Sequence, residues 1–362
     1  GNTMDIKVKW FYRLGFLLLL FVVLWVFFKL EPYWKPVLEI FFTASLPFIV
    51  AAFIAYLLHP LIQKLHKNGL EKWLSLLIIY ILFFGGLGYL LYKGVPVFVQ
   101  QLKGLSASIP EYVEQYDRWA YAIEERTKAW PLGIHEQIDN LFNALNTGLE
   151  HVVERILESL LWIVDKFFLI LLIPFITFYM IKDMEEIKNF FWQWVPLKKR
   201  EEARLVAVSI SESLGNYLRG QFIVCCLIGA ASAFLFSIIK LKFPLLLGFI
   251  VGITNVIPYF GPFIGAVPAV LVGLTMSGKM ALFVVVIIFS LQFLEGNILS
   301  PLIVGKTLRM HPLAIIFSIL IGGEVAGVLG LILAVPSAAV LKTIFLQSKI
   351  LFEKREQEES KL

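Results

Sequence analysis

From Phe243 to Met276 the chain runs for 34 residues without a charged side chain. About 20 apolar residues span a bilayer once, so this stretch is too long for a single straight helix. Helix-breaking and turn-forming residues interrupt it at Asn255, Pro258, Gly261, Pro262 and Pro268. Because non-helical backbone persists at membrane depth only where protein buries it or where it lines a watery cavity, the stretch predicts a broken membrane segment.

A second apolar stretch, Pro312 to Leu341, carries a similar interruption. We expect it to break at Gly322-Gly323-Glu324 and again at Pro336. Two interrupted segments in corresponding positions are the best sequence indication of the binding site of a transporter.

The composition agrees with a protein that is embedded in a membrane. Hydrophobic residues make up 59% of the 362 residues and charged residues only 16%, whereas soluble domains average about 25% charged. The formal net charge of +5 comes largely from loops, and no basic stripe indicates nucleic-acid binding. The two cysteines, Cys225 and Cys226, are neighbours, so no disulfide framework is predicted.

Hydropathy predicts an all-α, polytopic membrane protein of about eight hydrophobic segments. The candidate segments are 11–30, 38–62, 73–92, 158–181, 220–239, 243–276, 280–300 and 312–341. Residues 1–3 precede Met4 and are expected to be a cloning remnant, and 11–30 to be a retained helix rather than a cleaved signal.

The hydrophobic segments suggest five regions. These are transmembrane helices for scaffolding or oligomerisation at 4–92, an extracytoplasmic amphipathic region at 93–157, the fourth span with an amphipathic cytoplasmic helix at 158–217, a transport domain at 218–345 and a charged cytoplasmic tail at 346–362.

Lysine and arginine residues predict the orientation, since cytoplasmic loops carry an excess of them. They gather at 7–13, 64–72, 182–204 and 342–361, whereas the opposite short loops hold two each, near 29–35 and 240–242. Both termini are therefore predicted to be cytoplasmic.

Two amphipathic stretches flank these segments. Region 93–157 is predicted to form two or three helices with breaks at Pro110 and Pro131, serving as a gate, a receptor surface, an oligomer contact or a solvated cap. Stretch 182–217, with aromatic residues beside Lys198-Lys199-Arg200, is typical of a helix at the lipid headgroups.

Each interrupted stretch fits either one broken span or a hairpin that enters and leaves on the same face. In the hairpin topology Lys306 and Arg309 lie on the cytoplasmic side, whereas in the broken-span topology only Lys279 does. Because cytoplasmic loops are enriched in basic residues, the count of two against one favours hairpins. The architecture would then be six full spans plus two re-entrant hairpins, forming an inverted repeat that suits an elevator-like carrier.

A broken helix exposes backbone dipoles that can hold a solute or cation, and polar side chains nearby are binding candidates. Intramembrane carboxyls are functional candidates by default, although Glu295 could instead pair with Lys306 or Arg309, and Glu324 could reach water. Asn216 and Arg219 are secondary candidates that could simply extend toward the membrane surface. The primary candidates are Asn255, Pro258, Gly261, Pro262, Gln292, Glu295, Asn297, Gly323 and Glu324.

No catalytic constellation is recognisable in the sequence, so an enzyme is not predicted. The five histidines are scattered, which indicates no metal site, and no cofactor is expected. The phosphate-binding pattern G-x-x-x-x-G-K is also missing from the sequence, so uphill transport would have to use an ion gradient.

Several of these segments together resemble the autoinducer-2 exporter family of membrane transporters. The resemblance is carried by residues 255–265 (NVIPYFGPFIG), Gln292-x-x-Glu295-x-Asn297, Pro301-x-x-x-Gly305, His311-Pro312, Gly327-x-x-Gly330-x-x-x-Ala334-x-Pro336 and Pro174-Phe175-x-x-Phe178-Tyr179-x-x-Lys182-Asp183.

The resemblance implies a multi-pass permease of the bacterial inner membrane that forms homo-oligomers, with a pentamer as the candidate assembly. It implies export of an autoinducer-2-like signal by alternating access, or sodium(lithium)/proton antiport in which Glu295 and Glu324 couple Na⁺, Li⁺ or H⁺ movement. Glu324 departs from the residue expected in the family. A non-transporting scaffold or a channel is the remaining alternative.

Overall fold

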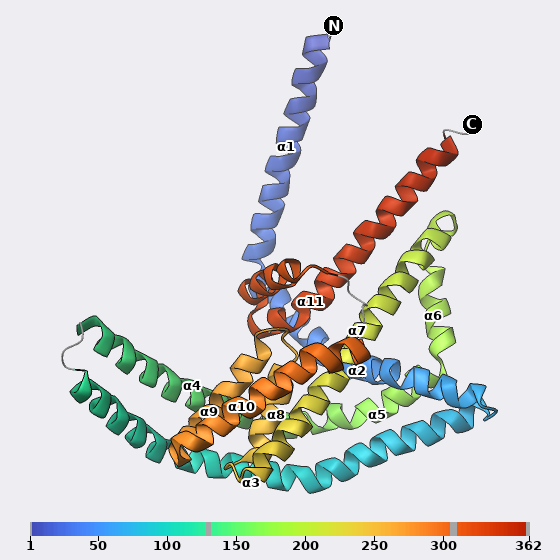
Figure 1. Cartoon of the computed structure of the whole chain (residues 1–362). Helices are drawn as coiled ribbons and strands as arrows, with labels where there is room; N and C mark the ends of the chain where they lie inside the picture. The colour runs from blue at the N-terminus through green and yellow to red at the C-terminus, as the bar shows by residue number, and fades with distance from the viewer. Residues whose placement is uncertain (1, 128–131, 305–309, 360–362) are drawn as a thin grey trace. The chain divides into compact units, whose positions relative to one another are not determined.

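The computed structural model describes residues 2–127, 132–304 and 310–359, and the regular elements within these ranges are all helices (Figure 1). The chain divides into two compact units. One comprises residues 1–76 and 166–184, and the other comprises residues 77–165 and 185–362.

The first unit is a helical assembly of α1 (Asn2–Lys29), α2 (Glu31–Lys67) and α5 (Phe167–Lys182) with the start of α3. Helices α2 and α5 pack against each other. The buried residues of α2 recur every three or four positions and therefore form one face of the helix. They are Pro47, Ala51, Ala55, Leu58 and Ile62.

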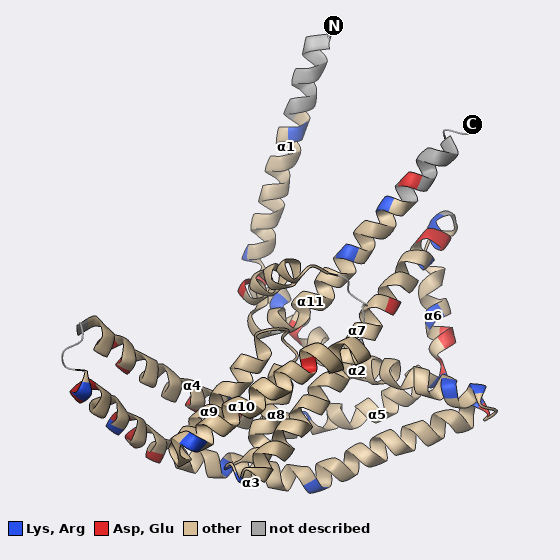
Figure 2. Cartoon of the chain, in the orientation of Figure 1, with Lys and Arg blue, Asp and Glu red and all other residues tan. Residues whose placement is uncertain are grey.

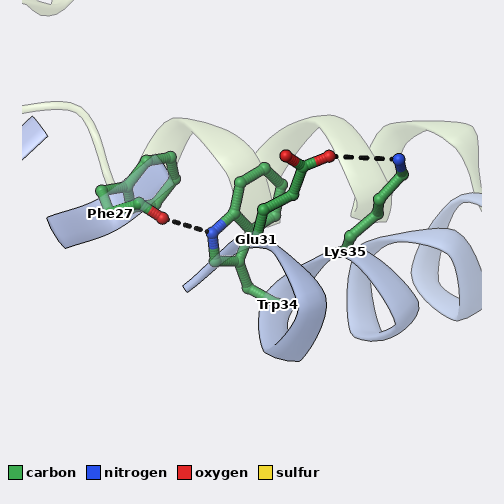
Figure 3. A network of polar contacts seen from close by, with 4 residues as sticks. All are labelled: Phe27, Glu31, Trp34 and Lys35. Atoms are coloured by element: carbon green, nitrogen blue, oxygen red, sulfur yellow. Dashed lines mark hydrogen bonds and ion pairs between the residues drawn. The ribbon is translucent and has the colours of Figure 1, made fainter. Parts of the chain in front are cut away.

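The junction between α1 and α2 is held by local contacts around Leu30 (Figure 3). The indole Nε1 of Trp34 donates to the carbonyl oxygen of Phe27 at 2.8 Å, and the two rings stack with centroids 4.8 Å apart. Lys35 also pairs with Glu31 at 3.1 Å. The carbonyl of Phe27 also accepts from the N–H of Leu30 at 3.2 Å, so the indole is the second donor to this group near the end of α1.

The second unit contains most of α3 and all of the later helices except α5. Its elements are α3 (Lys72–Arg126), α4 (Leu132–Asp165), α6 (Met184–Gln193), the 3₁₀ turn η1 (Leu197–Lys199), α7 (Arg200–Ile238), α8 (Pro244–Thr254), α9 (Gly261–Met276), α10 (Gly278–Leu294), the π-helical segment η2 (Glu295–Val304) and α11 (Pro312–Glu359).

Apolar side chains from α3, α4, α7, α8, α9 and α10 form the core of the second unit. Figure 2 shows α8 and α9 free of charged residues, as expected for helices at its centre. The largest side chains buried there include Tyr116, Phe236, Leu102 and Leu246. A smaller cluster joins Tyr217 and Ile257 to Ile319 and Val335 of α11.

Small residues allow α7, α8 and α9 to approach closely. A Cβ added to Gly248 would lie 2.5 Å from the Cβ of Ala233, and one added to Gly252 would lie 2.9 Å from the Cα of Gly229. Small residues at helix contacts are the usual means by which membrane helices bring their backbones together. The position of α8 against α7 therefore depends on the missing side chains at 248 and 252.

The first interrupted stretch folds back on itself. Helix α8 ends at Thr254, a turn follows, and α9 begins at Gly261. A Cβ on Gly265 would lie 2.8 Å from the Cα of Val251, which is possible only if the two helices pack side by side. Stretch 243–276 is therefore a helical hairpin, and α8, at about 1.5 Å per residue, is too short to span a bilayer.

The second interrupted stretch also folds back, but not at the predicted place. The non-helical backbone lies at Ala326 and Gly327, where Gly327 has φ +55°. Added Cβ atoms on Gly322 and Gly330 would each collide with the carbonyl of the other residue, so the two arms touch there. The predicted breaks at 322–324 and Pro336 are wrong, because both lie within helix.

Two further boundaries differ from the predictions. Helix α3 continues through Pro110, where a break was expected, because its buried face continues from Leu102 to Tyr116 across that proline. Helix α7 is continuous from Arg200 to Ile238, although 182–217 was predicted to be separate from a span at 220–239. Pro131, the other predicted break, lies outside the described residues.

Polar residues of α3 hold the open end of the α8–α9 hairpin. The side-chain oxygen of Gln101 accepts from the backbone N–H of Leu246 at 2.9 Å, at the first turn of α8. Gln115 donates to the carbonyl of Thr275 at 3.2 Å, near the end of α9, and Tyr116 donates to Leu271. The bonds to Leu246 and Thr275 satisfy groups that helix ends leave unpaired, whereas Leu271 lies within α9 and its carbonyl gains an additional donor. The end of the hairpin away from its turn is thus fixed to α3.

Six helices in the described residues are long and apolar enough to cross a membrane, or seven if α4 and α5 are counted together. Helices α8, α9 and Pro312–Val328, the first arm of α11, are shorter. The predicted all-α, polytopic fold is confirmed, and both interrupted stretches fold back on themselves, although the second arm of α11, Gly330–Ile350, is one of the six helices long enough to cross a membrane.

The contact between α7 and α8 yields a stability prediction. Replacing Gly248 with valine should lower the melting temperature, because the added side chain would overlap Ala233 and overpacking costs about 1–3 kcal/mol. Gly86→Val is the matched control, since a Cβ there meets nothing within 4 Å. Thermal unfolding of the detergent-purified variants, followed by circular dichroism, measures both. Equal melting of Gly248→Val and wild type would contradict the packing described above.

Candidate functional site

A cavity of about 870 Å³ lies at the turn between α8 and α9. It is bounded by α7, the turn, α9, α10, η2 and α11, all within the second unit. The lining residues are Tyr217, Gln221, Asn255, Ile257, Pro258, Tyr259, Pro262, Phe263, Ala266, Val270, Val285, Ile288, Phe289, Gln292, Glu295, Gly296, Ser300, Pro301, Ile315 and Val335.

Asn255 is the central polar residue of this cavity. It follows directly on the last residue of α8 and is 1% exposed. Its Nδ2 donates to Oε1 of Glu295 at 2.9 Å, whereas its Oδ1 has no hydrogen-bond partner among the described residues. Its main-chain oxygen accepts from Nε2 of Gln221 at 2.9 Å. Since an unsatisfied buried acceptor costs about 1–3 kcal/mol, Oδ1 is a candidate ligand for a bound donor.

Glu295 connects α10 to the cavity. It is the first residue of the π-helical segment η2, and such segments are frequent at functional sites. Its Oε2 accepts from Nε2 of Gln292 at 3.3 Å, so both carboxylate oxygens accept from side-chain amides. Lys306 and Arg309, the alternative partners considered for Glu295, lie outside the described residues.

The backbone of the turn explains why its residue types suit this geometry. Tyr259 has φ +66°, a left-handed conformation that reverses the chain. The N–H of Gly261 donates to the carbonyl of Ile257 at 2.9 Å, and a side chain on Gly261 would collide with the carbonyl of Thr254. Pro262 lies in the first turn of α9, where its missing N–H costs nothing.

Five of the primary candidate residues meet at the cavity. They are Asn255, Pro258, Pro262, Gln292 and Glu295. Gly261 does not line the cavity, and instead it allows the close approach of the two helices just described.

The other candidates lie elsewhere. Asn297 is exposed and donates to the carbonyl of Phe293 at 2.9 Å. Glu324 is exposed and Gly323 packs near Leu331, both at the tip of the second hairpin. Arg219 donates to Oδ1 of Asn216 at 3.0 Å along α7, and neither residue lines the cavity.

Two cavity residues of α7 escaped the sequence analysis. Tyr217 is 5% exposed, and Gln221 holds the main chain of Asn255. The two are four residues apart and therefore share a helix face. Polar groups at this spacing beside an apolar span were the available signal, but the predicted boundary between 217 and 220 separated them.

Comparison with known proteins agrees with this architecture. The profile of the AI-2E family of transporters matches residues 14–349. YrrI of Bacillus subtilis (strain 168), named as a candidate transport protein, is 44% identical over 329 residues, covering 91% of this chain and 93% of YrrI. YueF of the same organism, named likewise, is 34% identical over 349 residues, covering 94% and 93%.

A more distant relative carries a similar name. PerM of Escherichia coli (strain K12), named as a candidate permease, is 29% identical over 313 residues, which cover 84% of this chain and 88% of PerM. These names denote membrane transport proteins and not enzymes. The family profile covers nearly all of the described helices, including both hairpins and the cavity. The chain therefore belongs to the AI-2E family of transporters.

Proposed function

We propose that this protein is a secondary-active transporter that binds a small polar solute in the cavity at the α8–α9 turn. The observation that carries the proposal is the unpaired Oδ1 of the buried Asn255 beside a cavity of about 870 Å³. A cavity of this size falls within the usual range for small-molecule sites, about 300–1,000 Å³.

The hairpin supplies the polar groups that such a solute would contact. Helix α8 stops at Thr254, so the partial negative charge of its C-terminal end lies near the turn, while the carbonyls of Val251, Ile253 and Thr254 themselves accept from N–H groups of residues 255–257. The side chain of Gln221 donates to the main-chain carbonyl of Asn255. This bond fixes the turn and leaves the Asn255 side chain beside the cavity.

Alternating access would follow from movement of the hairpins relative to the full-length helices. The α8–α9 hairpin and the fold-back of α11 are the two interrupted segments that an inverted-repeat, elevator-like carrier requires. The bonds from Gln101 and Gln115 to the open end of the α8–α9 hairpin suggest that α3 moves with this hairpin.

The cargo and setting follow from the family. We propose an autoinducer-2-like signal as cargo, an ion gradient as the energy source, and a homo-oligomer in a bacterial inner membrane with both termini cytoplasmic. The match over residues 14–349 and the clustered basic loops support this proposal.

Substitution of Asn255 tests the site. Asn255→Ala removes the unpaired acceptor and the amide that donates to Glu295, and loss of one such bond costs about 1–3 kcal/mol. We expect at least a tenfold fall in export of the signal from cells whose own gene is deleted and replaced by the variant. Extracellular signal at matched protein abundance is the measurement.

Asn297→Ala is the matched control, because that amide is exposed and lies away from the cavity. It should export like the wild type. Undiminished export by Asn255→Ala would remove Asn255 from the transport path.

A second function, monovalent cation/proton exchange, is favoured by one observation. The Glu295 carboxylate lies at the cavity wall with both oxygens held by amides, an arrangement that can exchange a proton for Na⁺ or Li⁺. Glu324, the other predicted coupling residue, is exposed and does not line the cavity. The antiport proposal therefore assigns coupling to Glu295.

Everted membrane vesicles loaded with a pH-sensitive dye distinguish these two carboxyls. Glu295→Gln should abolish sodium- or lithium-induced proton movement, because the amide cannot release a proton. Glu324→Gln, the same change at the hairpin tip, should leave the movement intact. Retained movement in Glu295→Gln would show that another group couples the two ions.

A further inference from the structure

We propose that the cavity binds organic ammonium ions with an apolar body and rejects anions of the same size. The inference rests on the proposed function, in that it takes this cavity to be the solute site. It adds to the proposed autoinducer-2-like cargo a second class of solute, of positive charge, that neither the family profile nor the names of the relatives specify.

The first observation is the charge of the wall. Among the described residues that line the cavity, Glu295 is the single formally charged one, and none is a lysine, arginine or histidine. Its two carboxylate oxygens accept from neutral amides rather than from a cation. The described part of the wall therefore provides no counter-charge for the carboxylate, and a positively charged ligand can supply one.

The second observation is the balance of donors and acceptors. The amide nitrogens of Gln221, Asn255 and Gln292 each donate to another group of the protein. Oδ1 of Asn255, by contrast, is buried and lacks a partner. The wall thus offers the Glu295 carboxylate and this amide oxygen as acceptors to a ligand that carries N–H groups.

The third observation is the aromatic lining. Four parts of the chain contribute aromatic residues to the wall, namely α7, the turn, α9 and α10, with Tyr217, Tyr259, Phe263 and Phe289. Aromatic faces attract ammonium groups within about 6 Å of the ring centroid. Aliphatic residues form most of the remaining wall, which suits an apolar ligand body.

These three features would act together on one ligand. An ammonium group would lie between the Glu295 carboxylate and Oδ1 of Asn255, and its apolar body against the aromatic rings. A sulfonate or phosphate at the same place would meet a like charge and an acceptor with no cation to offset them. A bare alkali ion would leave most of the 870 Å³ unfilled.

Three probes with one aromatic ring and different charge test the inference. They are benzylammonium, neutral benzyl alcohol and benzenesulfonate, titrated calorimetrically into the purified full-length protein in detergent at pH 7. We expect benzylammonium to bind at least tenfold more tightly than benzenesulfonate, with benzyl alcohol between them.

Variants connect that preference to the cavity. Glu295→Gln should weaken benzylammonium binding at least tenfold, and Glu295→Asp, which keeps the charge, should preserve the preference. Phe263→Leu should weaken it about threefold, which provides a test if Glu295→Gln does not fold. Glu212→Gln is the matched control, because this carboxylate of α7 is exposed and does not line the cavity.

The outcomes separate this inference from the proposed function. Equal or tighter binding of benzenesulfonate, binding of none of the probes, or unchanged benzylammonium affinity in both Glu295→Gln and Phe263→Leu overturns it. Signal export that still depends on Asn255 would then leave the transport proposal standing. Glu295-dependent benzylammonium binding without any Asn255-dependent export would instead support the ligand class and refute the transport proposal.

Discussion

A helix that stops inside an apolar layer must satisfy its terminal backbone groups without help from lipid, and this constraint organises the second unit. At the end of α8 the carbonyl of Asn255 is taken by Gln221, a side chain from another helix. At the start of α8 the N–H of Leu246 is taken by Gln101. Because α7 and α3 supply these partners, the hairpin depends on its packing against both helices.

Close packing and the polar site are two results of the same sequence choice. Gly248 and Gly252 bring α8 against α7, which places Gln221 within hydrogen-bond distance of the turn. Gly261 and Gly265 bring α9 back along α8. Side chains at these positions would separate the helices, and the turn would lose the partners that make an interruption tolerable. The missing side chains of these four glycines therefore allow the close helix contacts that bring the polar groups of the cavity together.

Local pattern predicted part of this arrangement. Asn255 and Pro258 mark a turn by their own chemistry, and Glu295 is conspicuous as a carboxyl in an apolar helix. The second turn was misplaced because Gly322 serves close contact with Gly330 instead of ending a helix. Gln221 was overlooked because its role depends on a residue 34 positions away. The sequence pattern predicted features that depend on neighbouring residues, whereas contacts between residues on distant helices became visible only in the folded structure.

The way Glu295 is held decides what the cavity can do. An ion pair with a lysine or arginine would have neutralised the carboxylate and fixed it in one arrangement. The amides of Asn255 and Gln292 stabilise the charge through dipoles and leave it unneutralised. Both amides lie on the cavity wall, so any ligand that contacts them also changes the surroundings of the carboxylate. Under the proposed function, solute binding would therefore be linked to ionisation at Glu295, which is what coupling transport to an ion gradient requires.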